Sequence, residues 1–321
     1  MKKKILILGS SGFIGKNLSI YFSNIKNLTC YGTYFTNYPK ELKNKKIKLF
    51  KCDLTLKKQV DNVFKKIKPD IVINAAATTS GAKDIISKPF IHVNDNVIIN
   101  SMITRASFEY KIKHVIIFSC TVMYRSSKKK LREIDFDANK ELYPNYFGAG
   151  WMKVFVEKMS DFYSRISKTK YTLIRHSNVY GPYDKYDLEK SHVFGATITK
   201  VMKAKKEIII WGTGNESRDL IHINDLINFV ACAIKKQKRK FGLYNVGLSK
   251  NIKIKHLVKK IVKQANKKLE VKHDLTKKTL DNNVILNISK AKKELGWQPK
   301  IDINEGIKKT LSWYKKNFCS Q

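Results

Sequence analysis

Near its N-terminus the chain reads Lys4-Ile-Leu-Ile-Leu-Gly9-Ser-Ser-Gly12-Phe-Ile-Gly15. Four consecutive apolar residues predict a short buried β-strand, and three glycines spaced three apart predict a tight turn from that strand into a helix. Such a turn lets backbone N–H groups approach a pyrophosphate, and the helix N-terminus adds a partial positive charge. We therefore expect a dinucleotide site, with a merely structural glycine-rich turn as the alternative. Its expected cofactor-binding residues are Gly9, Ser11, Gly12, Phe13, Ile14 and Gly15.

From this strand onward, short apolar runs alternate with amphipathic stretches, a pattern that predicts βαβ units around a parallel sheet. The expected strands span residues 4–8, 29–34, 47–51, 71–74, 114–119 and 171–175. The expected helices span residues 12–22, 56–67, 97–110 and 151–166. Beyond residue 182 the pattern loosens, and it returns in a helix at 224–235 and a strand near 243–246.

The length of 321 residues and the hydrophobic fraction of 43% allow one large domain or two modest ones, each with its own core. We predict an α/β fold, a Rossmann-type doubly wound parallel sheet with a smaller interleaved α/β substrate-binding domain. The dinucleotide-binding domain is expected to comprise residues 1–178 plus about 220–246. The smaller substrate-binding domain is expected to comprise about 179–219 plus 247–321.

No stretch of the sequence has the pattern of a membrane or export segment. No apolar run approaches the roughly 20 residues that cross a bilayer. The run after Lys2-Lys3-Lys4 stops at Gly9, too early for a signal peptide. The five cysteines, at positions 30, 52, 120, 232 and 319, have neither a disulfide nor a metal spacing. We expect a cytoplasmic protein with no metal and no membrane partner.

The net charge of +38, from 64 basic and 26 acidic residues, introduces a nucleic-acid-binding hypothesis. Only seven of the basic residues are arginines, and the lysines are scattered over the expected helix faces among many Ile and Asn. This scatter is typical of compositional drift, so we expect no nucleic-acid partner. The positive field would still steer a phosphate-rich ligand toward the protein.

A second motif lies at residues 143–157, which read Tyr143-Pro-Asn-Tyr146-Phe-Gly-Ala-Gly150-Trp-Met-Lys153-Val-Phe-Val-Glu157. Together with the glycine loop, it resembles the extended branch of the short-chain dehydrogenase/reductase family, which contains the NAD-dependent epimerases and dehydratases of nucleotide sugars. In that family a catalytic tyrosine opens a helix, and a lysine four residues on shares its helix face. Tyr146 is present, but Gly150 stands where the lysine is expected.

The resemblance covers essentially the whole chain. Further matching segments are Cys52-Asp53-Leu54, Asn74-Ala-Ala-Ala77, Val93-Asn94, Arg175-His-Ser-Asn178-Val-Tyr-Gly-Pro182, Ser191-His192-Val-Phe-Gly-Ala196, Trp211-Gly-Thr-Gly214, Arg218-Asp-Leu-Ile-His222 and Leu295-Gly-Trp297. The cofactor-binding residues implied in addition to the loop are Asp53, Leu54, Ala75, Ala76, Ala77, Asn94 and His176. The substrate-binding residues implied are Thr78, Asn178, His192, Val193 and Arg218.

Arg218 would grip a nucleotide diphosphate, a bidentate task suited to guanidinium. The alternatives at single residues are a salt bridge to Asp219 or Asp225 for Arg218, a helix N-cap for Asp53 and a packing role for His192.

NAD is the expected cofactor. An acid at the end of the second strand would accept the ribose 2′-hydroxyl of NAD, and an arginine there would bind the 2′-phosphate of NADP. Residues 31–37, Tyr-Gly-Thr-Tyr-Phe-Thr-Asn, contain neither. Without the arginine, the sequence favours NAD.

The expected catalytic residues are Tyr146, Cys120 and Thr121. The family has a Ser or Thr four residues before a strand-end tyrosine, and counting back from Tyr124 gives Cys120. Thr121 and Val122 replace the acid/base pair that dehydratases need, so elimination of water is not expected. Val122 also replaces the cysteine base of fucose-synthase-type epimerases. Hydride transfer with Tyr146 as proton acceptor remains.

A missing lysine weakens a tyrosine base. A phenol has a pKa of about 10 in water, and a nearby cation lowers it by about 1–3 units. Losing a shift of about 2 units costs about 2.7 kcal/mol, roughly a hundredfold in reactive phenolate. Lys153 lies seven residues beyond Tyr146, so Arg175 and His176 from the sixth strand are the expected replacements.

Two functions remain open: a slow oxidoreductase that works without the lysine, and a non-catalytic NAD-binding sensor. The substrate-side residues favour the enzyme. Residues 146–151 and 190–196 also resemble a bacterial subgroup that handles heptoses for capsules, which implies NAD-dependent oxidation of a GDP-linked sugar to a 4-keto sugar. A nucleotide-sugar epimerase or 4-reductase is the alternative. The resemblance also implies a homodimer or higher homo-oligomer formed through helices 97–110 and 151–166.

Overall fold

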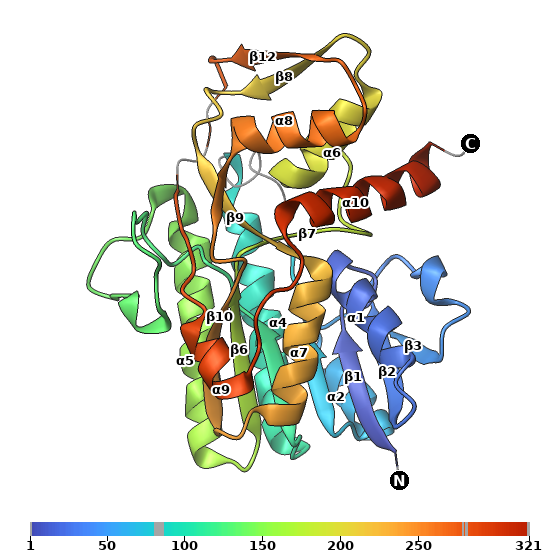
Figure 1. The fold of residues 1–321 in the computed structure, drawn as a ribbon. Helices are drawn as coiled ribbons and strands as arrows, with labels where there is room; N and C mark the ends of the chain where they lie inside the picture. The colour runs from blue at the N-terminus through green and yellow to red at the C-terminus, as the bar shows by residue number, and fades with distance from the viewer. Residues whose placement is uncertain (1, 80–86, 278, 280–281, 320–321) are drawn as a thin grey trace.

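The structure is a computed structural model that describes residues 2–79, 87–277, 279 and 282–319. Its centre is a seven-stranded sheet in the order β10-β6-β5-β4-β1-β2-β3, with parallel pairing throughout (Figure 1). The strands are β1 (Lys3–Leu8), β2 (Leu28–Tyr34), β3 (Ile47–Lys51), β4 (Ile71–Asn74), β5 (His114–Phe118), β6 (Lys170–His176) and β10 (Phe241–Val246). The strand order reverses direction at β1, so a crevice for a dinucleotide is expected at the carboxyl ends of β1 and β4. The predicted α/β fold class is confirmed.

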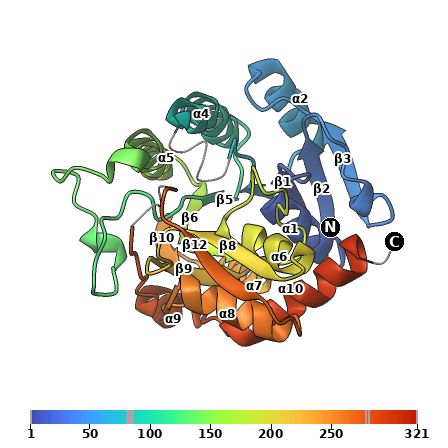
Figure 2. The same cartoon turned by 90° about the horizontal axis from the view of Figure 1, so that it is seen from above.

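Helices cover both faces of this sheet, as Figure 2 shows from above. One face carries α1 (Phe13–Ser23), α7 (Ile223–Lys236) and α9 (Ser289–Leu295). The other carries α2 (Lys57–Ile67), α4 (Asn94–Glu109) and α5 (Phe147–Ile166). Alternate residues of β1 point to the two cores, Ile5 and Ile7 to one and Leu6 and Leu8 to the other. A strand buried on both faces therefore reads as a continuous apolar run.

A smaller lobe lies beyond the carboxyl ends of the strands (Figure 1). It contains a sheet of β11-β9-β7, a pair β12-β8 and three helices around a third core. Its elements are β7 (Asn178–Tyr180), α6 (Val193–Lys203), β8 (Glu207–Trp211), β9 (Ser217–His222), β11 (Asn251–Lys253), α8 (Ile254–Gln264), β12 (Glu270–Asp274) and α10 (Ile303–Phe318). The chain enters this lobe after β6 and returns to the large sheet through α7 and β10. It then forms β11, α8 and β12 in the lobe, packs α9 on the large sheet and ends in the lobe with α10.

Four short 3₁₀-helices complete the described secondary structure: η1 (Lys40–Leu42), η2 (Pro89–His92), η3 (Glu133–Asp135) and η4 (Pro144–Tyr146). The last of these, η4, shows that Tyr146 precedes the helix of the 143–157 motif and does not lie within it. Pro144 opens η4, and α5 follows at Phe147, four residues earlier than expected. Gly150 therefore lies inside the first turns of α5. Among the described residues no helix is long and apolar enough to cross a membrane.

Candidate active site

The glycine loop between β1 and α1 has the backbone geometry of a phosphate-binding turn. Gly9 has a φ of +80°, and a Cβ placed on it would lie 2.7 Å from the Cα of Ala76. A Cβ on Gly15 would collide with the Gly9 carbonyl oxygen. Glycine at both positions lets the loop turn tightly and pack α1 against it. The N–H groups of the first turn of α1 have no helical acceptors, so this cradle fits the pyrophosphate of NAD.

Ala76 lies against Gly9, with Ala75 and Ala77 on either side of it, at the carboxyl end of β4. The Asn74 side chain orders this small-residue wall. Its Oδ1 accepts a hydrogen bond from the Ala76 N–H at 3.1 Å, and its Nδ2 donates to Asn100 Oδ1 at 2.9 Å. The wall leaves space beside the loop, where the resemblance implies that the cofactor lies.

Asp53 and Leu54 follow β3 on the same edge of the sheet. One carboxylate oxygen of Asp53 accepts from the N–H and the hydroxyl of Thr55, at 2.9 and 2.7 Å. Leu54 is buried in the core beneath α2. The N-cap of α2 is Leu56, so Asp53 closes the preceding turn and does not cap the helix.

The start of α4 contains a buried asparagine that the sequence analysis missed. Asn94 is exposed, whereas Asn96 is buried and accepts from the Thr78 N–H at 2.9 Å. Asn96 Nδ2 donates to Thr78 O at 3.0 Å, which fixes the backbone after the alanine wall. The signal was the spacing of Asn96 and Asn100, four apart on the buried face of the helix.

Lys153, seven residues after Tyr146, is a lysine of α5 that reaches the end of β5, near Cys120. Gly150 is buried, and a Cβ on it would lie 2.5 Å from Leu142 Cδ1 and 3.4 Å from Val122 O, so that face packs onto the loop beneath the helix. The position that counting forward from Tyr146 assigns to the family's lysine therefore packs against Leu142 and the Val122 backbone. Lys153 Nζ donates to Phe118 O at 2.9 Å, at the carboxyl end of β5. In the family the catalytic tyrosine lies four residues before the lysine, and the residue four before Lys153 is Ala149.

Tyr146 enters from one turn earlier, as the last residue of η4. Burial raises the pKa of its phenol above the ordinary value, and the Arg218 guanidinium opposes this shift. Cys120 and Tyr143 also interact with the phenol electrostatically. The phenol therefore lies near the end of β5, with Ala149 in the helical position that the family gives to tyrosine.

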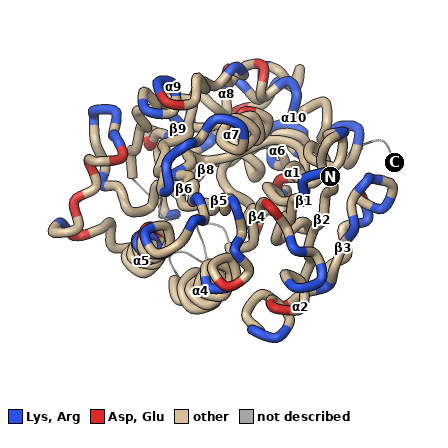
Figure 3. Tube along the Cα trace, turned by 90° about the horizontal axis from the view of Figure 1, so that it is seen from below, with Lys and Arg blue, Asp and Glu red and all other residues tan. Residues whose placement is uncertain are grey.

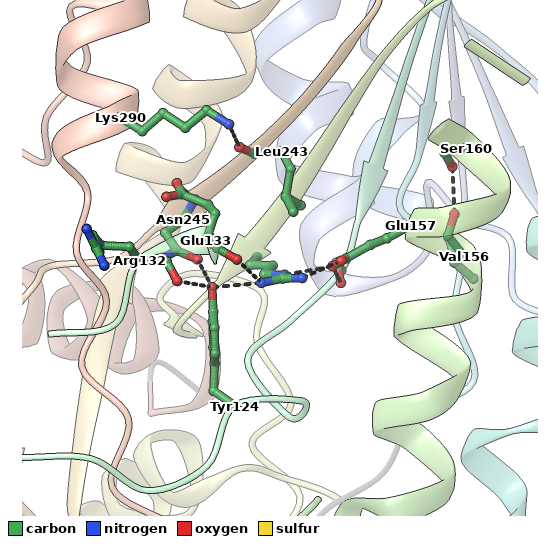
Figure 4. Close-up of polar contacts among 11 residues, drawn as sticks. Tyr124, Arg132, Glu133, Val156, Glu157, Ser160, Leu243, Asn245 and Lys290 are labelled. Carbon is green, nitrogen blue, oxygen red and sulfur yellow. Dashed lines mark hydrogen bonds and ion pairs between the residues drawn. The ribbon is translucent and has the colours of Figure 1, made fainter. Parts of the chain in front are cut away.

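Arg175 and His176, the expected replacements for the lysine, do not fill that role. Arg175 is buried and donates to both carboxylate oxygens of Glu157, to Tyr124 Oη and to Glu133 O. Figure 4 shows Tyr124, Glu133 and Glu157 converging on this point from three segments. His176 is kept neutral, since burial lowers its pKa to about 4. The cations at the site are Lys153 and Arg218.

Cys120 and Thr121 are partly buried where β5 ends. Burial raises the pKa of the Cys120 thiol, and the nearby charge of Lys153 lowers it. The neighbouring positions carry a hydroxyl at Thr121 and an alkyl group at Val122, so the strand end offers no acid/base pair of carboxyl groups for elimination.

On the substrate side, Asn178 Nδ2 donates to Asp219 O at 3.1 Å, and Arg218 Nη1 donates to Ser217 O at 2.8 Å. The carboxylates of Asp219 and Asp225 accept from backbone N–H groups of other segments, so neither forms the alternative salt bridge with Arg218. His192 is exposed at the N-cap of α6, followed by Val193. Among the described residues no group of three His, Cys, Asp or Glu side chains could hold a metal.

Residues 5–247 match the family model described as "NAD dependent epimerase/dehydratase family". The chain is 27% identical to GDP-L-colitose synthase of Yersinia pseudotuberculosis over 97% of each chain. Its fold is similar to that of a UDP-glucose 4-epimerase from Thermotoga maritima solved with UDP-glucose, with a TM-score of 0.87, 22% identity and coverage of 98% and 99%. It is also similar to that of a GDP-6-OMe-4-keto-L-xylo-heptose reductase from C. jejuni, with a TM-score of 0.83, 20% identity and 98% coverage of both chains.

Fold and site together define an NAD-dependent enzyme with a tyrosine at the end of its fifth strand. The match over residues 5–247 makes the assignment specific: the chain belongs to the NAD-dependent epimerase/dehydratase family. NAD is its cofactor. When bound, NAD supplies the hydride acceptor, and the glycine loop and the alanine wall are the residues that fit it.

Proposed function

We propose that the enzyme oxidises the C4 hydroxyl of a GDP-linked heptose to a ketone, as a GDP-manno-heptose 4-dehydrogenase. The observation that carries this proposal is the grouping of Tyr146, Cys120 and Lys153 at the end of β5, without a carboxylate at positions 121 and 122. Oxidation needs one proton acceptor and one hydride acceptor. Elimination needs a further acid/base pair, which this strand end lacks.

Bound NAD would accept the C4 hydrogen as hydride, and the Tyr146 oxygen would take the proton of the C4 hydroxyl. Burial alone makes the Tyr146 phenol a reluctant acid, since it raises the phenol pKa. Arg218 opposes that shift, and the Lys153 ammonium lies near Cys120 at the same strand end. The Arg218 charge favours the phenolate, the form that can take the proton.

The GDP-linked substrate is supported by the relationship to a GDP-L-colitose synthase and by the resemblance of residues 146–151 and 190–196 to the heptose subgroup. Arg218 supplies the guanidinium for the diphosphate, and Asn178, Thr78, His192 and Val193 are the proposed sugar-side contacts. We assign the reaction to capsule or other surface polysaccharide synthesis in the cytoplasm.

Reduction of a 4-keto sugar is the second candidate, because the same residues catalyse the reaction in either direction. Similarity of fold to a 4-keto-heptose reductase favours this candidate. The two are separated by supplying either GDP-manno-heptose with NAD or the 4-keto sugar with NADH and comparing initial rates. A non-catalytic sensor would turn over neither.

The decisive experiment incubates the protein with NAD and GDP-manno-heptose and identifies the product by mass spectrometry. Loss of two hydrogens with formation of NADH is expected, and loss of water or no turnover of any nucleotide sugar would refute the proposal. Tyr146→Phe should remove the activity and leave NAD binding intact, because the phenyl ring keeps the shape and loses only the proton acceptor. An unchanged rate in this variant would exclude Tyr146 as the base.

We also propose that the chain forms a homodimer through α4 and α5. These helices expose apolar side chains that a monomer would leave in water. The exposed residues are Ile98, Phe108, Phe155, Phe162 and Ile166.

A further inference from the structure

Lys153 and Glu157 lie four residues apart on α5, a spacing at which opposite charges ordinarily pair. Here the pair does not form. Lys153 Nζ donates to Phe118 O at 2.9 Å, and the Glu157 carboxylate is bound by Arg175 and by Ser119 Oγ, which donates at 2.6 Å. Phe118 and Ser119 are neighbours at the end of β5, so the ammonium and the carboxylate lie close to one another and have different partners.

Arg175 holds Glu157 in a closed arrangement. Its Nε donates to one carboxylate oxygen at 2.9 Å and its Nη2 to the other at 2.6 Å, the bidentate geometry that guanidinium favours. The side chains of Arg175 and Glu157 are only 3% and 6% exposed, so water does not compete for either charge. With Ser119 as a third donor, the carboxylate has little capacity left for an ammonium.

Arg175 is itself fixed from behind. Its Nη1 donates to Tyr124 Oη at 2.9 Å and to Glu133 O at 3.0 Å. Tyr124 Oη donates in turn to Asn245 Oδ1 of β10 at 2.9 Å (Figure 4). The guanidinium, which belongs to β6, is therefore anchored by the segment between β5 and α5, itself tied to β10, and it remains on Glu157.

We propose that Arg175 is a positioning residue that keeps Glu157 from pairing with Lys153, so that the ammonium remains at the end of β5 beside Cys120. The three side chains together carry one net positive charge, and this arrangement leaves that charge on the face where Tyr146 lies. Without Arg175, the buried carboxylate draws Lys153 away from Phe118 O. The consequence for catalysis rests on the proposed function, whereas the placement of Lys153 does not.

Cys120 reports the position of Lys153 without any substrate. The charged and titratable groups that act on its thiol are Lys153 and Glu157 from α5 and Arg175 from β6, with Tyr146 beside it. Alkylation of Cys120 by iodoacetamide depends on the thiolate fraction and is followed by peptide mass spectrometry, which separates it from the cysteines at 30, 52, 232 and 319. The variant Lys153→Met is compared in three backgrounds: wild type, Arg175→Met, and Arg175→Met with Glu157→Gln.

We expect Lys153→Met to slow alkylation roughly tenfold in the wild-type background, because a cation within a few Å shifts a pKa by about 1–3 units. In Arg175→Met the same change should have less than about a twofold effect, since Lys153 has already moved to Glu157. The double variant should restore the full effect, because Gln has no charge to attract the lysine. An equal effect of Lys153→Met in all three backgrounds would overturn the proposal.

If Arg175→Met does not fold, Arg175→Lys takes its place, since a single ammonium covers one carboxylate oxygen and leaves the other to Lys153. The pH profile of kcat on GDP-manno-heptose then serves as the second readout. Its acidic limb, where the phenolate becomes protonated, should shift to higher pH in the arginine variant and return in the double variant. If the effect of Lys153→Met on alkylation differs among the backgrounds as expected but no sugar is oxidised, the proposed placement of Lys153 stands and only the proposed function is refuted.

Discussion

Ala149 occupies the helix position that the family gives to the catalytic tyrosine, and Tyr146 reaches the site from one turn earlier. The double variant Tyr146→Phe, Ala149→Tyr should therefore recover activity that Tyr146→Phe loses. We expect a loss of about 10²–10⁴ in kcat for the single variant, the range for a general base, and recovery of at least tenfold in the double. Rates are measured from NADH formation. Ala149→Phe in the Tyr146→Phe background is the matched control, since it adds the ring without the hydroxyl, and recovery there would contradict the assignment.

Gly150 offers a second test at the scale of one residue. Gly150→Lys should destabilise the protein and not improve catalysis, because the new Cβ would lie 2.5 Å from buried Leu142 Cδ1. Overpacking lowers the free energy of unfolding by about 1–3 kcal/mol, whereas replacing a glycine inside a helix raises it by about 1 kcal/mol. Urea unfolding measures the difference. Ala149→Lys is the control, since that position already carries a Cβ, and a faster enzyme from Gly150→Lys would restore the reading in which 150 faces the site.

The site residues differ in how far the sequence specifies them. The glycine loop was predictable because each glycine answers a local steric demand that Gly9 and Gly15 show directly. The lysine was not, because counting forward from Tyr146 assumes that the tyrosine sits in the helix. Whether a residue belongs to η4 or α5 depends on Pro144 and on packing against Leu142, which spacing alone does not reveal.

Among the elements, the strands of the large sheet were predicted within one or two residues at most ends. A strand that is buried on both faces appears in the sequence as a continuous apolar run. The sequence therefore predicts β1, β4 and β5 directly. The small lobe was harder to predict. Its strands β7 and β11 have three residues each and are defined only by their pairing with β9, a contact between distant segments.

The helices α4 and α5 carry the prediction that belongs to this scale. Phe155 and Phe162 are 45% and 55% exposed on α5, and burial against a second copy would cover them. Phe155→Asp with Phe162→Asp should convert the proposed dimer into a monomer, because each carboxylate would lie in an apolar interface. Sedimentation velocity measures the mass. Leu275→Asp, 70% exposed beyond β12, is the control and should leave the assembly unchanged. A wild-type protein that is already monomeric would refute this interface.

Over the whole molecule, basic residues are dispersed and not gathered in one track. Figure 3 shows them from α2 and β3 to α5 and α9. A field of this kind attracts anionic ligands in general, which suits a diphosphate substrate.

The two lobes are joined above α1 by the loop at residues 181–186. Asn17 Nδ2 donates to Pro182 O at 2.9 Å, and Lys185 Nζ donates to Thr79 O at 2.8 Å. Between them lies Asp184, whose Oδ1 accepts from the Lys185 N–H at 2.7 Å. Its Oδ2 is buried and has no hydrogen-bond partner among the described residues. An unsatisfied buried carboxylate makes the junction between the lobes sensitive to pH.

Burial raises the pKa of Asp184 from 3.8 to about 7. The folded state therefore holds this proton through a range in which the unfolded chain has released it, and stability falls as pH rises from about 4 to about 7. Asp184→Asn removes the ionisation. Its free energy of unfolding should therefore rise relative to that of the wild type across this pH range, by at most about 1.4 kcal/mol per pH unit. Urea unfolding of both proteins at intervals from pH 5 to 8 measures the difference. If the new amide changes the free energy of unfolding by the same amount at every pH, the difference between the two proteins still depends on pH with the same slope. Asp187→Asn, an exposed neighbour, is the control. A pH-independent difference between Asp184→Asn and the wild type would show that Asp184 is already satisfied in solution.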